Sequence, residues 1–212
     1  MSSAKQQTDS FAVIGAGMSG VLAGIKLKQA GHPFTIFEKA DRVGGTWREN
    51  TYPGIACDVP SHIYSYSFEL NPDWSEFTSP GAEVQEYFER VSKRYGIDEH
   101  IRFNEAVIRC TWMDGEWEIE TEKGHIERVR WVIAATGILH HPKYPDIDGL
   151  DTFEGPMFHT ARWDHDIDIT GKRIGLIGTG SSGVQITAAV APKVENLTVF
   201  QRTAQWLSLI HI

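Results

Sequence analysis

Two glycine triplets carry the most specific chemistry in this sequence. The first consists of Gly15, Gly17 and Gly20, and the second of Gly178, Gly180 and Gly183. A G-x-G-x-x-G turn between a strand and a helix lets a pyrophosphate approach the backbone and rest on the free N–H groups of the helix N-terminus. Each triplet follows a short apolar run, at residues 11–14 and 173–177. Both therefore predict a dinucleotide site.

The residues that follow the next strand distinguish the two turns. Glu38 ends "PFTIFEK", at about the 20-residue distance typical of an acid that binds a ribose. Its carboxylate can accept hydrogen bonds from both ribose hydroxyls. The matching strand "LTVFQRT" has no acid and ends in Arg202 and Thr203. Because an acid repels a 2′-phosphate and a guanidinium can bind it, the second turn is predicted to take NADPH.

Two dinucleotides in one chain indicate a flavin that is reduced by a nicotinamide, so the expected cofactors are FAD and NADPH. The stretch "VGGTW" ends at Trp47, and its glycines would let the backbone approach a ring system. We therefore expect Gly45, Thr46 and Trp47 to contact FAD. The Trp47 indole could stack on the flavin or belong to the core, and the sequence leaves both possibilities open.

The surrounding elements suit this chemistry. A strand, a helix that stops at Gly31 and a second strand form one unit, and the same order restarts at Lys172. Between them lie an irregular region, a helix over 82–95 and three short strands, with Asp114-Gly115 as a hairpin turn. The predicted fold class is α/β, with two Rossmann-like units in three layers and a β-hairpin or meander insert.

The same pattern divides the chain into five segments. We expect a disordered N-terminus over 1–10, an FAD-binding domain over 11–140, a linker over 141–170 and the start of an NADP-binding domain over 171–206. The final "LSLIHI", residues 207–212, has no strand or helix pattern and matches the translation of a transposon adapter used in sequencing libraries. We therefore expect a non-native tail there, and both nucleotide domains to be incomplete through truncation.

Bulk composition restricts the partners. The net charge is −8 and no Lys/Arg cluster occurs, so nucleic acid is not expected. No apolar run approaches the ~20 residues of a membrane span, and "WVIAATGIL" is interpreted as a buried strand. No secretory signal precedes Phe11, and Cys57 and Cys110 are far apart. We expect a cytoplasmic protein with reduced thiols and no metal; the His140-His141 pair lacks a metal-ligand spacing.

Several motifs together resemble the Baeyer–Villiger monooxygenases, which turn ketones into esters or lactones. They are "GAGMSG", "GGTW", "YPGIACDVPSHIYSYSF", "AATG", "FEGPMFHTARWD", "GTGSSG" and "VFQRT". The most specific is the family fingerprint F-x-G-x-x-x-H-x-x-x-W followed by Pro or Asp, which is matched at every position by Phe153, Gly155, His159, Trp163 and Asp164. These residues would anchor a linker at the junction of the two domains, with His159 in a conformational role.

The resemblance implies a mechanism and further residues. NADPH reduces FAD, the flavin captures molecular oxygen as a peroxide, and the peroxide attacks a small ketone. Asp58 matches the catalytic aspartate, which orients an active-site arginine in this family. Positions near FAD would be Ser19, Tyr64 and Val107; Thr136 and Gly137 would lead into the linker; Ser181, Ser182 and Gln185 would lie in the NADP turn.

Other interpretations stay open. The family's active-site arginine matches no residue of this sequence, so we expect the chain as written to lack turnover and to bind FAD weakly or not at all. A flavin-containing monooxygenase acting on nitrogen or sulfur carries a similar fingerprint, although Trp163 favours the Baeyer–Villiger branch. A third interpretation is a nucleotide-binding module without oxygenase chemistry. A disulfide reductase would need a redox cysteine pair, which Cys57 and Cys110 do not form.

Overall fold

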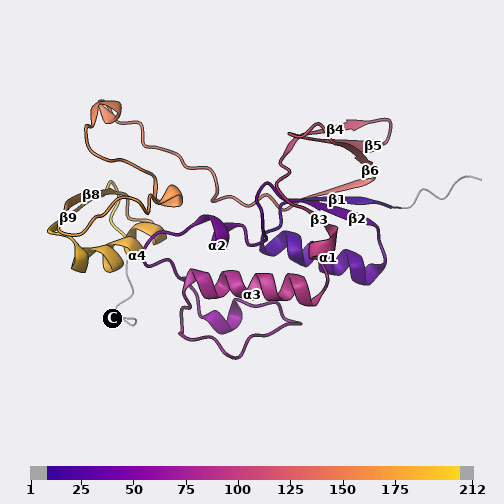
Figure 1. The fold of residues 1–212 in the computed structure, drawn as a ribbon, viewed down its shortest axis with the longest axis horizontal. Coiled ribbons are helices and arrows are strands. Elements are labelled where there is room, and N and C mark those ends of the chain that lie inside the picture. The colour runs from indigo at the N-terminus through magenta and orange to yellow at the C-terminus, as the bar shows by residue number, and fades with distance from the viewer. Residues whose placement is uncertain (1–8, 206–212) are drawn as a thin grey trace, which may run out of the picture. The chain divides into compact units, whose positions relative to one another are not determined.

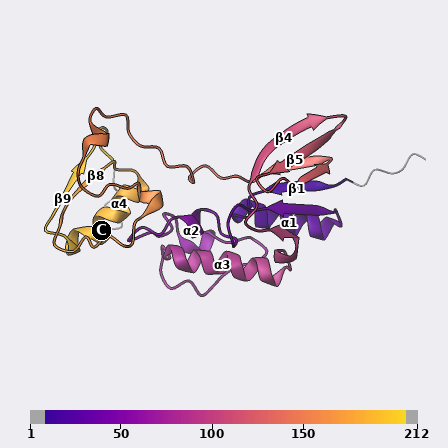
Figure 2. The ribbon, with the colours of Figure 1, turned by 45° about the horizontal axis from the view of Figure 1, so that its top comes forward.

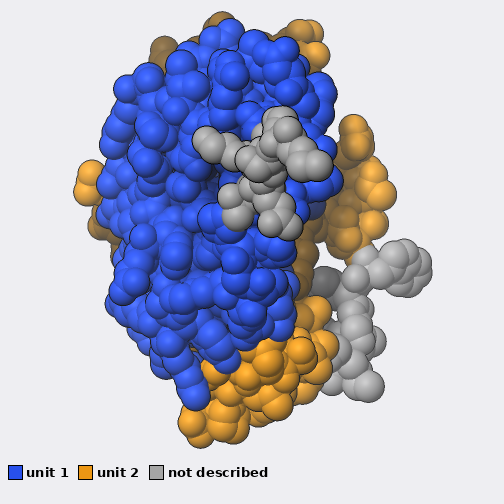
Figure 3. Space-filling view, turned by 90° about the vertical axis from the view of Figure 1, so that its right-hand side faces the viewer, with its two compact units in different colours: residues 1–48, 85–140 blue, residues 49–84, 141–212 orange. Residues whose placement is uncertain are grey.

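The computed structural model describes residues 9–205, so the expectations for residues 1–8 and for the tail at 207–212 lie outside the described residues. The chain divides into two compact units. Unit 1 comprises residues 1–48 and 85–140, and unit 2 comprises residues 49–84 and 141–212 (Figure 3). Within residues 9–205, no helix is both long and apolar enough to cross a membrane.

Unit 1 is built on a parallel sheet of four strands in the order β3-β2-β1-β7. The strands are β1 (Phe11–Ile14), β2 (Phe34–Phe37), β3 (Ile101–Arg102) and β7 (Trp131–Ala134). Helices α1 (Met18–Ala30) and α3 (Gly81–Arg94, of which 85–94 belong to unit 1) lie on one face (Figure 1). The other face carries an antiparallel ribbon of β4 (Val107–Met113), β5 (Glu116–Thr121) and β6 (Ile126–Val129) (Figure 2). The predicted three-layer α/β arrangement is confirmed here.

Apolar side chains on both faces of the sheet hold these layers together. Ala12 and Phe37 are buried against Ile119 and Val129 of the ribbon. On the helical side, a Cβ placed on Gly24 of α1 would lie 2.8 Å from Ile36 Cδ1, so this glycine allows close packing of helix and strand. The sheet is therefore buried on both faces, as parallel sheets usually are.

The ribbon confirms the predicted hairpin and corrects the strand that follows it. Asp114 and Gly115 have φ angles of 53° and 83°, as a tight two-residue hairpin turn requires. The third of the three expected short strands, over 125–137, divides at Arg130: β6 pairs with β5, whereas β7 pairs with β1. One strand could not serve an antiparallel ribbon and a parallel sheet at once.

Strand β7 is also less buried than expected. Among the residues that the structure describes, it has a neighbouring strand on one side only, and Trp131 is 48% exposed. The Trp131 indole stacks on Phe11 and donates a hydrogen bond to Asp9 Oδ1 at 3.1 Å. The apolar run was therefore a correct signal for a strand and a wrong one for complete burial.

Unit 2 repeats the strand–helix–strand order. Strands β8 (Arg173–Ile177) and β9 (Asn196–Phe200) are parallel, and α4 (Ser181–Val190) connects them through η5 (Ala191–Lys193). Its core contains Tyr52, Leu176, Ile186 and Val190, with Trp163 packed against them.

Short helices lie in the irregular segments of both units. They are α2 (Thr46–Glu49), η1 (Ser61–Ile63), η2 (Asp98–His100), η3 (Leu150–Thr152) and η4 (Thr160–Arg162).

The compact units do not follow the sequence boundaries everywhere. Residues 49–84, placed in the FAD-binding domain by sequence, cluster with residues 141–212. Tyr52 in the unit 2 core gives the physical reason. A contact between residues so far apart in the chain cannot be read from local patterns. The functional domain boundaries stay a prediction.

Candidate nucleotide sites

The first glycine turn is shaped by backbone contacts that exclude side chains. Gly15 has a φ of 101°, and its N–H donates to the Phe37 carbonyl at 2.8 Å. A Cβ on Gly15 would lie 2.6 Å from the Ala135 carbonyl oxygen, and one on Gly20 would lie 1.8 Å from the Gly15 carbonyl oxygen. Both positions therefore require glycine. The AATG stretch, with Thr136 next to Ala135, lies directly beside this turn.

Gly17 faces the second glycine-rich stretch of unit 1. The Cα of Gly45 lies 3.5 Å from an ideal Cβ on Gly17, and the Gly44 N–H donates to the Ala16 carbonyl at 3.0 Å. Gly17 also precedes α1, and no side chain caps the N-terminus of this helix. The Gly17 and Gly45 backbones, which carry no side chains, thus meet at a helix N-terminus. They form a cradle that a Cβ would fill, and this cradle fits a bound pyrophosphate.

Other predicted residues of the first site lie in the same unit. Ser19 is exposed in the first turn of α1, and Thr46 and Trp47 form the start of α2, both half-buried. Val107 begins β4 and packs against the core under the ribbon. Each of these positions is in unit 1, so this unit contains most of the predicted FAD contacts.

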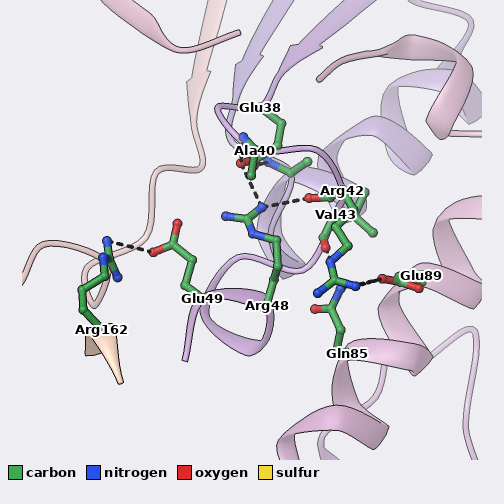
Figure 4. Close-up of polar contacts among 10 residues, drawn as sticks. Glu38, Ala40, Arg42, Val43, Arg48, Glu49, Gln85, Glu89 and Arg162 are labelled. Atoms are coloured by element: carbon green, nitrogen blue, oxygen red, sulfur yellow. Dashed lines mark hydrogen bonds and ion pairs between the residues drawn. The ribbon is translucent and has the colours of Figure 1, made fainter. Parts of the chain in front are cut away.

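Glu38 is buried directly after β2, and its carboxylate accepts three hydrogen bonds from its own chain. Its Oε2 accepts a hydrogen bond from Ala16 N at 2.8 Å, and its Oε1 accepts from Ala40 N and Arg48 Nη1, both at 3.0 Å (Figure 4). The carboxylate thus fixes the glycine turn at Ala16. Sequence reasoning missed Arg48, although an arginine directly after "GGTW" is a visible charge.

The second turn reproduces the positive φ, the strand-end hydrogen bond and the close contact of the third glycine that the first turn shows. Gly178 has a φ of 107°, and its N–H donates to the Phe200 carbonyl at 2.9 Å. A Cβ on Gly183 would lie 2.6 Å from the Gly178 carbonyl oxygen, whereas one on Gly180 would meet nothing within 4 Å. The repeat that the sequence predicted is therefore present in the backbone geometry.

The two turns differ after their second strands. Gln201 follows β9 where Glu38 follows β2, and Arg202 and Thr203 come next, both exposed. The Thr203 carbonyl accepts a hydrogen bond from Thr179 Oγ1 at 3.3 Å, which ties this end to the turn. Ser181 and Ser182 lie in the first turn of α4. The absence of an acid at this strand end agrees with the predicted preference for a 2′-phosphate.

Gln185, predicted in the NADP turn, has its side-chain amide in a different contact. The Tyr52 hydroxyl donates to Gln185 Oε1 at 2.9 Å, and Gln185 Nε2 donates to the Ala56 carbonyl at 2.9 Å. A Cβ on Gly54, which has a positive φ, would lie 2.8 Å from the Gln185 carbonyl oxygen. The loop over 52–57 therefore lies flat on α4, and Asp58 follows it directly.

We expect Gln185→Met to lower the free energy of unfolding by about 2 kcal/mol, because two hydrogen bonds are lost and the Ala56 carbonyl is left unpaired. Tyr52→Phe should cost about 1 kcal/mol. Urea unfolding curves measure both. Because the two side chains share one contact, Tyr52→Phe should add little in the Gln185→Met background. Fully additive losses would contradict the arrangement.

Asp58 and Tyr64 lie in the irregular part of unit 2. Asp58 is exposed in the bend after Cys57, and no cation in the described part of the chain is paired with its carboxylate. Tyr64 is half-buried at the end of η1. Burial raises the pKa of the Cys57 thiol, and the Asp58 carboxylate raises it further. Cys57 and Cys110 are both free thiols, and a raised pKa makes an unreactive thiol.

The fingerprint residues divide into anchored and exposed positions. Trp163 packs on the unit 2 core and makes an edge contact with Phe158, with ring centroids 5.1 Å apart. Phe153 is 63% exposed, and its ring covers Gly155 so closely that a Cβ there would lie 2.7 Å away. Asp164 Oδ1 accepts a hydrogen bond from Asp166 N at 3.0 Å. Trp163 is thus anchored within unit 2, and the anchoring of a linker at the junction of the two domains stays a prediction.

His159 is the N-cap of η4. Its Nδ1 accepts a hydrogen bond from Ala161 N at 3.1 Å, and its ring makes an edge contact with Tyr144. Burial lowers the pKa of His159, and the Arg162 guanidinium lowers it further. The imidazole therefore acts as a neutral acceptor, which agrees with the conformational role that the sequence indicated.

A pH dependence follows from this cap. Since the folded chain has the lower pKa, the unfolded chain takes up the proton first, so the stability is complete above the ordinary value of 6.5 and is lost as pH falls through the folded pKa. Protonation also removes the acceptor for Ala161 N. The free energy of unfolding between pH 8 and pH 5 should fall more steeply in wild type than in His159→Asn, which caps without titrating. Equal slopes would contradict this.

Metal ligation has no structural support in the described region. Among residues 9–205, no three His, Cys, Asp or Glu side chains are placed to hold a metal ion. Thr51 Oγ1 and His165 Nε2 lie 2.8 Å apart and form a hydrogen bond.

This fold carries two strand–glycine turn–helix units of the kind that binds dinucleotides in other proteins. A profile of the family described as pyridine nucleotide-disulphide oxidoreductase matches residues 12–209, so the chain belongs to this family. A Baeyer-Villiger monooxygenase of Streptomyces coelicolor is 49% identical over 199 residues, which cover 92% of this chain and 38% of that protein. The resemblance to Baeyer–Villiger monooxygenases drawn from the motifs is confirmed.

Solved structures agree. The open crystal structure of cyclohexanone monooxygenase superimposes with a TM-score of 0.84 at 40% identity, over 93% of this chain and 40% of that one. Oxidized steroid monooxygenase bound to NADP gives a TM-score of 0.83 at 41% identity, over 93% and 40%. The chain thus spans about 40% of the length of the proteins it matches. The family's name includes a disulphide, but the two free cysteines do not form a redox pair.

Proposed function

We propose that this chain carries the nucleotide-binding turns of a Baeyer–Villiger monooxygenase, which uses FAD, NADPH and molecular oxygen to convert a small ketone into an ester or lactone. The repeated glycine turn, with Glu38 after one copy and Arg202 after the other, is the observation that supports this most directly. When bound, FAD supplies the oxygen-activating chemistry. The two free cysteines support a reducing compartment, and we propose the cytoplasm.

In that proposal, the residues of this chain bind the two cofactors and orient them. The first turn, with Gly15, Gly17, Gly20 and Gly45, receives the FAD pyrophosphate, while Glu38 accepts from the ribose. The second turn, with Gly178, Gly180, Ser181 and Ser182, receives the NADP pyrophosphate, and Arg202 binds the 2′-phosphate. Asp58 is the proposed catalytic residue, whose exposed carboxylate is available to orient a cation.

Flavin content and product analysis test the proposal. Of the two sequence expectations for FAD, weak binding and none, this proposal requires weak binding. Titrated with FAD, the purified chain should show a weak but saturable change in flavin absorbance, and titration with NADP⁺ should saturate as well. A flavin absorbance that does not change with added FAD would contradict the flavin assignment. With NADPH and oxygen, lactone from a cyclic ketone supports the full activity, whereas sulfoxide from a thioether and no lactone would favour a flavin-containing monooxygenase.

A nucleotide-binding module without oxygenase chemistry is the second candidate. It is favoured by one observation: among the described residues, no cation pairs with the Asp58 carboxylate. If this candidate holds, FAD and NADP⁺ bind, while NADPH oxidation in the presence of a ketone yields hydrogen peroxide and no ester. Ester formation by the purified chain would rule it out.

A further inference from the structure

Glu38 and Arg48 form a buried ion pair at the edge of the first glycine turn. Arg48 Nη1 lies 3.0 Å from Glu38 Oε1, and the two side chains are 7% and 5% exposed, Arg48 first. Burying two charges has a desolvation cost that their attraction only partly offsets, so such a pair adds little to stability. Glu38 is itself the predicted ribose acceptor, so the ion pair indicates a role for Arg48 in nucleotide binding.

The guanidinium of Arg48 also holds the loop that leads to Gly45. The same Nη1 donates to the Arg42 carbonyl at 2.8 Å, and the Gln85 amide donates to the next carbonyl, that of Val43, at 2.7 Å (Figure 4). Arg48 thus joins the carboxylate after β2 to the strand-to-helix loop. The position of the carboxylate and the shape of the cradle are therefore coupled.

A count of acceptor positions shows what Arg48 leaves open. A carboxylate has about four acceptor positions, two on each oxygen. Oε1 of Glu38 uses both, for Ala40 N and Arg48 Nη1, and Oε2 uses one, for Ala16 N. The remaining position is on Oε2, the oxygen that faces the glycine turn. As it stands, the carboxylate can accept one ribose hydroxyl and not two.

We propose that Arg48 is a positioning residue of the first nucleotide site: it occupies Oε1 of Glu38 and so directs a ribose hydroxyl to Oε2. The inference rests on the proposed function, because it takes the first turn as the adenosine site of FAD. Without Arg48, the buried carboxylate has no neutralising charge and one of its three fixed contacts is lost. It then discriminates poorly between a ribose that has hydroxyls and one that lacks them.

Adenosine diphosphate and its 2′,3′-dideoxy analogue are suitable probes, since they differ only in the ribose hydroxyls. Isothermal titration of the full chain should give wild type a preference for ADP of about tenfold, the worth of one hydrogen bond to a charged acceptor. In Arg48→Met the preference should fall to within about twofold. Arg48→Lys keeps the charge and a donor, and should restore most of it.

Arg109→Met is the matched control, because it removes an arginine from an exposed ion pair with Glu120 on the ribbon. It should leave the preference unchanged. Thermal unfolding reports whether each variant folds. If Arg48→Met does not fold, Arg48→Gln is the second variant, because it removes the charge, leaves the Glu38 carboxylate in place and should show the same lost preference.

The outcomes separate the inference from the function it rests on. A folded variant without Arg48 that keeps the tenfold preference overturns the positioning role. Wild type that binds neither ADP nor FAD overturns the adenosine site itself, whatever Arg48 does. A wild-type preference that is lost with Arg48 and recovered with lysine supports both, since a merely structural role would weaken the two probes equally.

Discussion

Gly20→Ala is expected to unfold unit 1, whereas Gly17→Ala leaves it folded and removes nucleotide binding. The Cβ added at Gly20 would lie 1.8 Å from the Gly15 carbonyl oxygen, and neither backbone can move without breaking the Gly15–Phe37 hydrogen bond. The expected loss is about 3 kcal/mol or more. A Cβ at Gly17 meets Gly45 Cα at an ordinary 3.5 Å and fills only the cradle. Thermal unfolding and FAD titration measure the two effects.

The same pair of substitutions can be made in the second glycine turn of the chain. Gly183→Ala places a Cβ 2.6 Å from the Gly178 carbonyl oxygen, while Gly180→Ala enters open space. We therefore expect Gly183→Ala to destabilise unit 2, and Gly180→Ala to retain stability and lose NADP⁺ affinity. If the third glycine of either turn tolerated alanine without loss of stability, the steric account of both turns would be wrong.

Trp163→Ala should lower the stability of unit 2 by about 2–3 kcal/mol, because a large aromatic side chain leaves the packing of Leu176 and Ile186. The indole is half-buried, so the loss is below that of a fully buried tryptophan. Hydrogen exchange of the α4 and β8 amides, or urea unfolding followed by tryptophan fluorescence, would measure it.

Phe153→Ala is the matched control within the same fingerprint. The Phe153 side chain is largely exposed and contacts its neighbour Gly155, so the free energy of unfolding should change by less than about 0.5 kcal/mol. Equal losses at both positions would show that the fingerprint packs as one cluster, contrary to the structure.

Local patterns predicted most of the elements. The runs at 11–14 and 173–177, the helix after Gly17 and the Asp114-Gly115 hairpin are set by neighbouring residues, and each is present in the structure. Strand β3 was missed because two residues, Ile101 and Arg102, carry no periodicity of their own and become a strand only by pairing with β2. The division of residues 125–137 at Arg130 likewise depends on two different partner strands.

The candidate site was predictable where glycine or charge marks it. The triplets and Glu38 stand out because a positive φ or an acid after a strand leaves a local trace. Arg48 pairs across ten positions, and Gln185 bonds to Tyr52 across 133. Such long-range polar contacts follow from tertiary packing, which a single sequence does not reveal. The role of Gln185 at NADP stays a prediction, and in the structure its amide joins α4 to the loop over 52–57.

The matching hydrogen bonds of Gly15 to Phe37 and of Gly178 to Phe200 have an evolutionary consequence. Two turns that agree in backbone contacts within one chain are what an ancient internal duplication would leave. Gly20 and Gly183 are constrained by backbone collisions, and Gly15 and Gly178 by a positive φ, so substitution at these four positions is costly. The residues just beyond the strands, Glu38 in one copy and Gln201 with Arg202 in the other, could change without disturbing the turn. Selection could thus separate the cofactor preferences of the two copies there while the inherited backbone stayed the same.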